Sequence, residues 1–121
     1  MKVLVTGGAG FLGSSLVEKL IEQGHQVAVV DDLSRGKASQ VHPDAKLFIA
    51  DASVEGSLDE ALQWLGGLDL IHHLAAINGT KRFHEQADLV IKTNVNSTHV
   101  ALSLAQEQNA RVVVYSSPEA Y

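Results

Sequence analysis

Three glycines spaced three residues apart, in the stretch GGAGFLG that begins at Gly7, constrain this chain more than any other feature of its sequence. The run before them, KVLVT, is short, apolar and rich in β-branched residues, which is typical of a buried strand. The residues after them carry apolar side chains at helical spacing as far as Gly24, which is expected to end a helix. The sequence therefore predicts a strand, a sharp glycine turn and a helix.

Strand-like and helix-like segments continue to alternate along the chain. Short strands that are apolar throughout indicate parallel strands covered on both faces, in a doubly wound, Rossmann-like α/β sheet. Right-handed crossovers favour the strand order 3-2-1-4-5. The second helix is expected to begin with a capping box formed by Ser57 and Glu60. The strands are expected at residues 2–6, 26–30, 46–50, 68–74 and 111–115, and the helices at residues 11–23, 57–65 and over most of 82–108.

The spacing of the glycines suits the binding of a dinucleotide. A glycine at position 7 permits a backbone conformation that a β-carbon penalises. Gly10 leaves room for a diphosphate against the main chain, and Gly13 allows the helix to approach the sheet closely. The helix N-terminus offers N–H groups to the phosphates. A P-loop would end in Gly-Lys-Ser or Gly-Lys-Thr, whereas this turn ends in Gly-Ser-Ser, so nucleoside triphosphate hydrolysis is not expected.

An acidic residue stands where a dinucleotide site of this kind places its ribose ligand. Asp31 directly follows the expected second strand and stands 18 residues after Gly13, where the ribose carboxylate is expected. A carboxylate there accepts hydrogen bonds from the adenosine 2′-hydroxyl and repels a 2′-phosphate, and Asp32 adds to the repulsion. Arg35 acts in the opposite direction, since it could neutralise a 2′-phosphate. The acidic pair favours NAD over NADP.

The composition narrows the partners and the compartment. The 121 residues carry a formal net charge of −5, which gives no electrostatic reason to bind nucleic acid or an anionic membrane surface. The absence of cysteine excludes disulfides and thiolate metal sites and fits a cytoplasmic location. No signal peptide or transmembrane stretch is recognisable.

Adjacent His72 and His73 would point to opposite faces of a strand, so they are not expected to share a metal ion. One should face the core and the other the cofactor side. Trp64 is expected in the core.

Six motifs occur in order and together resemble a known family. They are TGGAGFLG, VDDLSRG, AD, HHLAA, TNVNST and VYSSPEAY. The chain resembles the extended short-chain dehydrogenase/reductase family, in particular its NAD-dependent sugar-nucleotide epimerases and dehydratases of the UDP-galactose 4-epimerase type. The resemblance covers nearly the whole chain but only the first part of a family member.

The resemblance implies roles for particular residues. Asp51 would accept a hydrogen bond from the adenine amino group, Asn94 would help to fix the active-site geometry, and Ser117 would be the catalytic serine because it stands four residues before Tyr121. The implied cofactor contacts are Gly7, Gly10, Phe11, Leu12 and Gly13 at the diphosphate, Asp31, Asp32, Leu33 and Ser34 at the ribose, Asp51 and Ala52 at the adenine, Leu74, Ala75 and Ala76 after the fourth strand, and Asn94.

The family's chemistry is a transient oxidation of a sugar nucleotide, in which a tyrosine with a lysine four residues later acts as the base. No tyrosine of this chain has such a lysine, since the residue four positions after Tyr115 is Glu119, and Tyr121 is the last residue. We therefore expect residues 1–121 to form a dinucleotide-binding domain that is incomplete at its C-terminal end and lacks the substrate domain, and to bind cofactor without turnover. A stand-alone NAD sensor and a half-enzyme completed by a second chain are the alternatives. The apolar fifth strand would offer an exposed sheet edge for homo-oligomerisation.

Overall fold

The computed structural model describes residues 1–75 and 87–115, which form a single parallel sheet with helices on both faces. The strand order is β3-β2-β1-β4-β5 and every adjacent pair is parallel, so the predicted fold class and strand order are confirmed. The strands are β1 (Lys2–Thr6), β2 (Gln26–Asp31), β3 (Lys46–Ile49), β4 (Leu70–His73) and β5 (Arg111–Val114). The helices are α1 (Phe11–Glu22), α2 (Asp59–Leu65) and α4 (Ala87–Gln108), with a short 3-10 helix at Ala38–Gln40.

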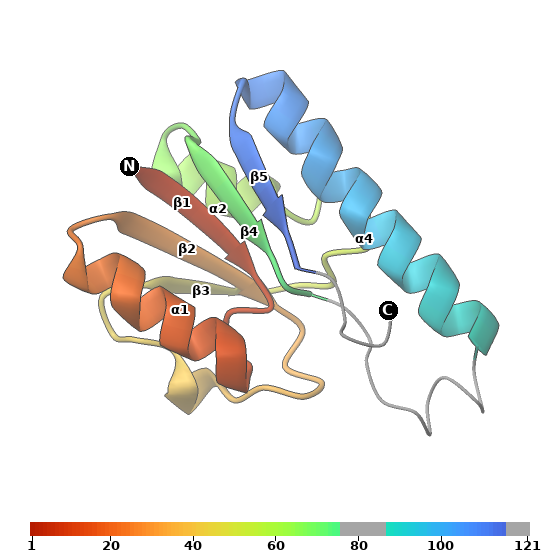
Figure 1. Cartoon of the computed structure of the whole chain (residues 1–121), viewed down its shortest axis with the longest axis horizontal. Coiled ribbons are helices and arrows are strands. Elements are labelled where there is room, and N and C mark those ends of the chain that lie inside the picture. The colour runs from red at the N-terminus through yellow and green to blue at the C-terminus, as the bar shows by residue number, and fades with distance from the viewer. Residues whose placement is uncertain (76–86, 116–121) are drawn as a thin grey trace.

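The helices cover the two faces of the sheet unequally. Helix α1 lies on one face, over β1 and β2, and α2 and α4 lie on the other (Figure 1). Because successive strand residues point to opposite faces, Val3 and Val5 of β1 pack under α1, whereas Leu4 packs under α2 and α4. The strand arrowheads in Figure 1 all point the same way, so the carboxyl ends of β1, β2 and β4 lie side by side at one end of the sheet.

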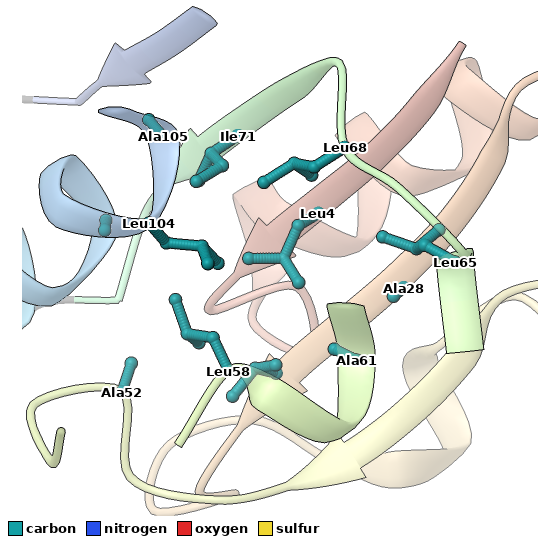
Figure 2. Packing of buried hydrophobic residues seen from close by; sticks show 12 residues of the cluster. Leu4, Ala28, Ala52, Leu58, Ala61, Leu65, Leu68, Ile71, Leu104 and Ala105 are labelled. Carbon is teal, nitrogen blue, oxygen red and sulfur yellow. The ribbon is translucent and has the colours of Figure 1, made fainter. Parts of the chain in front are cut away.

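The larger core cluster joins the sheet to α2 and α4. Figure 2 shows Leu4 of β1, Leu58 before α2 and Leu104 of α4 directed toward one another. Leu4 and Leu58 are almost wholly buried. Burying one such side chain contributes roughly 1.5–3 kcal/mol, so this cluster fixes where α4 lies against β4 and β5.

Several element boundaries and one side chain differ from expectation. The fourth strand is shorter than residues 68–74, and α1 ends at Glu22, after which Gly24 takes a left-handed conformation with φ of 87°. Trp64, expected in the core, is 39% exposed and packs edge-on against Phe48, with ring centroids 6.4 Å apart. Trp64 lies near the end of the short helix α2, over β3. Because β3 is an edge strand of the described sheet, one side of the ring stays exposed to solvent.

The predicted capping box at α2 is wrong. The helix begins only at Asp59, and its N-cap is Leu58, without a side-chain capping hydrogen bond. The chain before it folds into two turns, in which Ser57 N–H donates to Val54 O and Asp59 N–H donates to Gly56 O. These turns carry the Ser57 hydroxyl away from the helix end and bury it without a hydrogen-bond partner among the described residues.

Replacing Ser57 with alanine should therefore not destabilise the protein. Loss of a true N-cap costs about 1 kcal/mol, whereas removal of a buried, unpaired hydroxyl is neutral or stabilising by up to about 1 kcal/mol. Urea unfolding of Ser57→Ala, with Glu60→Ala alongside, would measure this. A loss of about 1 kcal/mol in both variants would show that the capping box forms after all.

Candidate functional site

At two positions the glycine turn after β1 is packed so closely against main-chain atoms that no side chain fits. Gly7 has φ of 76°, and a β-carbon there would lie 2.8 Å from the Ala75 nitrogen, at the end of β4. A β-carbon on Gly13 would overlap the Gly7 carbonyl oxygen and lie 2.8 Å from the Gly8 α-carbon. The turn is thus pressed between the first turn of α1 and the loop after β4. Gly13 allows α1 to approach the turn itself, rather than the sheet.

Gly10 differs because the space beside it is open. A β-carbon on Gly10 would meet only the Gly7 carbonyl oxygen, at an ordinary 3.6 Å. The helix starts immediately after it, and Ser14 N–H is the donor that bonds back to the Gly10 carbonyl. The N–H groups of the first turn precede any intrahelical acceptor, and Phe11 beside them is 88% exposed while Leu12 is 60% exposed. An open cradle at the positive end of a helix fits a diphosphate.

Asp31 reaches the glycine turn from the end of β2. Its Oδ2 accepts the Ala9 N–H at 3.0 Å and its Oδ1 accepts the Leu33 N–H at 2.8 Å. The residue is only 9% exposed, so this carboxylate is held rigidly at the edge of the sheet. Each carboxylate oxygen can accept more than one hydrogen bond, so the group retains capacity for a ribose hydroxyl.

The loop after β2 folds back onto the same turn. Leu33 takes a left-handed conformation with φ of 63°, and Asp32 Oδ1 accepts the Ser34 N–H at 2.9 Å. Lys37 N–H donates to Ala9 O at 3.2 Å, and a β-carbon on Gly36 would lie 2.5 Å from that carbonyl. The structure therefore joins Asp31 directly to the glycine turn, and it holds the loop that carries Asp32, Leu33 and Ser34 against the turn through Gly36 and Lys37.

Ala9 and Gly36 hold this loop in place, and sequence reasoning missed both. The wholly buried Ala9 uses both its N–H and its carbonyl oxygen to tie the loop to the turn. The only sequence signal was Gly36 itself, the last residue of the VDDLSRG stretch.

The two residues predicted at the adenine lie after β3. Asp51 is exposed and its Oδ1 accepts both the N–H and the hydroxyl of Ser53, at 2.9 and 2.7 Å. The Ala52 side chain is buried in the core cluster with Leu58, so any contact with a ligand would come from its main chain.

The residues after β4 complete the edge of the site. Leu74 N–H donates to Thr6 O, and Ala75 N–H donates to the Thr6 hydroxyl at 3.2 Å. Asn94 lies in the first half of α4, and its carbonyl oxygen accepts the hydroxyls of Ser97 and Thr98 at 3.1 and 2.9 Å. Two further predicted site residues, Ala76 and Ser117, lie outside the described residues.

The two adjacent histidines face opposite sides of the sheet, as predicted. His73 is 4% exposed and bonds to the hydroxyls of Thr6 and Ser97 through its two ring nitrogens, at 2.6 and 3.3 Å. His72 lies on the other face, where its Nδ1 is 2.8 Å from the hydroxyl of Tyr115. Burial lowers the pKa of both imidazoles and raises the pKa of Tyr115.

These shifts predict that the protein loses stability as the pH falls. The unfolded chain binds a proton at each histidine near pH 6.5, whereas the folded chain resists protonation because its pKa is lower. The contribution is therefore fully present above about pH 6.5 and is lost as the pH falls through the folded pKa.

Thermal unfolding at pH 7.5 and at pH 5 would measure this loss. We expect a lower midpoint at pH 5 and a smaller pH dependence in His73→Asn. An unchanged pH dependence in the variant would show that His73 does not contribute.

A doubly wound parallel sheet with a glycine turn, a buried carboxylate and an open helix N-terminus at one edge defines a dinucleotide-binding domain. The model of the NAD dependent epimerase/dehydratase family matches residues 3–121. The chain belongs to this family, and its cofactor is NAD.

Curated relatives and solved structures agree with the assignment. The chain is 36% identical to a UDP-N-acetyl-alpha-D-glucosaminuronate decarboxylase of Bacillus cytotoxicus, over 99% of this chain and 37% of the relative. It is also 36% identical to a UDP-glucose 4-epimerase of Mycolicibacterium smegmatis, over 97% of this chain and 38% of the relative. The chain thus spans little more than a third of the length of these relatives.

Two solved structures have the same fold over most of the chain. A crystal structure of a UDP-galactose 4-epimerase matches with a TM-score of 0.86 and 37% identity, covering 100% of this chain and 40% of that one. The Thermus thermophilus UDP-glucose 4-epimerase in complex with NAD matches with a TM-score of 0.82 and 32% identity, covering 90% of this chain and 35% of that one.

In the described ranges 1–75 and 87–115, no helix is long and apolar enough to cross a membrane.

Proposed function

We propose that this chain is the NAD-binding part of an enzyme that transforms a nucleotide sugar through transient oxidation at a sugar carbon. The observation that carries the proposal is the position of Asp31. Its carboxylate is fixed by two main-chain N–H groups directly beside the open glycine turn, where a dinucleotide would place its adenosine ribose.

The described residues suggest how the cofactor is held. The diphosphate would lie against Gly10 and the first N–H groups of α1, at Phe11 and Leu12. Asp31 would accept the ribose hydroxyl, with the Asp32–Ser34 loop closing around the ribose. The dinucleotide would then pass over Ala75, which lies against Gly7.

When bound, NAD supplies the capacity to take a hydride from a sugar carbon and to return it. This chain's own part is to bind and orient the cofactor and to exclude a 2′-phosphate through Asp31 and Asp32. Ser117 is proposed to hold the reacting sugar oxygen, and Asn94 to support the geometry beside it. The relatives named above act on UDP-sugars, which makes a nucleotide sugar the substrate class that we propose, in a protein that includes a substrate domain.

Calorimetric titration of this chain with NAD+ and then with NADP+ tests the proposal. We expect NAD+ to bind and NADP+ to bind at least about tenfold more weakly, a difference of 1.4 kcal/mol that repulsion between a 2′-phosphate and a carboxylate can supply. Binding of NADP+ as tight as that of NAD+ would contradict the role given to Asp31. Turnover of a UDP-sugar by the chain alone would contradict the binding-only role.

We also propose that the chain associates with a second copy through strand β5. In the described part of the chain β5 is an edge strand, and Val113 and Val114 are 40% and 46% exposed. Such an edge can pair with a second copy, so light scattering should show a mass that rises with concentration. A monomeric mass at every concentration would count against the pairing. We also propose a cytoplasmic location, which the absence of cysteine fits.

A further inference from the structure

Three buried polar side chains meet at the carboxyl ends of strands β1 and β4. Thr6 comes from β1, His73 from β4 and Ser97 from α4, and none is more than 4% exposed. Buried hydroxyl and imidazole groups require hydrogen-bond partners. Here they find them in one another, since His73 lies between the other two residues.

The hydrogen bonds around Ser97 favour one direction of donation. The Ser97 hydroxyl donates to main-chain carbonyls and its hydrogen is shared between Asn94 O at 3.1 Å and Ala75 O at 3.4 Å. Its oxygen therefore faces His73 as an acceptor. In this arrangement the proton between the two residues sits on His73 Nε2, which is 3.3 Å away.

A neutral imidazole carries one N–H, so His73 Nδ1 is then an acceptor. The Thr6 hydroxyl, 2.6 Å from Nδ1, donates to it and accepts the Ala75 N–H in turn. The series of hydrogen bonds leaves the Ala75 N–H, passes through Thr6, His73 and Ser97, and returns to the Ala75 carbonyl oxygen. Burial, which lowers the pKa of His73, favours the neutral imidazole that this direction needs.

We propose that Thr6, His73 and Ser97 close a ring of hydrogen bonds that fixes Ala75 against Gly7, and that His73 and Ser97 are positioning residues for the dinucleotide. The second part rests on the proposed function, since it takes Ala75 as a cofactor contact. Ala75 N would lie only 2.8 Å from a β-carbon on Gly7, so a small displacement of Ala75 alters the shape of the glycine turn. The ring also ties α4, which carries Asn94, to that same edge.

The ring makes a spectroscopic prediction that does not depend on any ligand. In the ¹⁵N-histidine spectrum of this chain at pH 7.5, His73 should carry its proton on Nε2, with Nδ1 unprotonated; His73→Asn identifies the signal. Protonation at Nδ1 would reverse the direction of the hydrogen bonds and overturn the ring.

Ser97→Ala and Thr98→Ala form a matched pair for the positioning role. Both hydroxyls donate to Asn94 O, but within the described residues only the Ser97 hydroxyl also bonds to His73 and Ala75. Ser97→Ala should lower the affinity for NAD+ about fivefold, as expected for one hydrogen bond, and speed amide exchange at Ala75. Thr98→Ala should leave both within twofold. Equal effects of the two variants would overturn the positioning role.

A second pair covers the case in which Ser97→Ala does not fold. Thr6→Ser keeps the hydroxyl, whereas Thr6→Val keeps the shape and removes it. We expect slow exchange at Ala75 in Thr6→Ser and fast exchange in Thr6→Val, and the same rate in both would overturn the ring. If the wild-type chain binds no NAD+, the proposed function fails, while the tautomer and the exchange at Ala75 still decide the ring.

Discussion

Replacing Gly13 with alanine is expected to cost about 3 kcal/mol or more in the free energy of unfolding and to abolish the binding of NAD+. The added β-carbon would overlap the Gly7 carbonyl oxygen and press on the Gly8 α-carbon. Both neighbours are backbone atoms, so no side chain can rotate away, and α1 must separate from the glycine turn. Urea unfolding and calorimetry would measure the two losses.

Gly10→Ala provides the comparison that separates folding from binding. Gly10 has φ of −80° and ψ of 179°, which any residue adopts, and a β-carbon there has open space. We expect this variant to keep its stability within about 1 kcal/mol but to lose NAD+ binding, because the β-carbon occupies the space proposed for the diphosphate. Unchanged affinity in Gly10→Ala would place the diphosphate elsewhere.

Replacing Asp31 with alanine should reduce both stability and affinity. The carboxylate accepts two main-chain N–H groups in a buried place, so its removal leaves the Ala9 and Leu33 donors unpaired. A hydrogen bond to a charged group contributes roughly 1.5–3 kcal/mol, so we expect at least about 2 kcal/mol of destabilisation. The affinity for NAD+ should fall by at least about tenfold, through the lost ribose hydrogen bond and the loosened loop.

Asp31→Asn isolates the part of this effect that depends on charge. Asparagine has nearly the same shape and keeps one oxygen acceptor, so the variant should fold with a smaller loss of stability. Because it no longer repels a 2′-phosphate, the preference for NAD+ over NADP+ should shrink. An unchanged preference would mean that Asp32 or the loop, rather than Asp31, selects the cofactor.

The features that followed from sequence were those set by local pattern. The short β-branched runs predicted five parallel strands and their order, and β1 was bounded correctly at Lys2–Thr6. The left-handed φ of Gly7 followed from the need for a sharp turn between a strand and a helix. The family resemblance then supplied the residues that we propose at the ribose, and the structure ties one of them, Asp31, to Ala9.

The features that sequence could not supply depend on contacts between distant residues. Ser57 and Glu60 have the spacing of a capping box, but the turns before α2 move the hydroxyl away from the helix. The contact between His73 and Ser97 joins residues of two elements, and no local signal marks either as a partner. Ala9 carries no polar side chain, so only the fold shows that its main chain holds the loop after β2.

Chemical-shift mapping with NAD+ tests the central claim most directly. A cavity of about 440 Å³ between α4 and the turns before α2, lined by Ser53, Asn96 and His99 among others, is a competing place for a ligand. In a ¹⁵N-labelled sample, we expect NAD+ to cause the largest amide chemical-shift changes at Gly7 to Leu12, Leu33 and Ala75. Large shifts around Asn96 and His99, with the glycine turn unchanged, would contradict the proposed dinucleotide site.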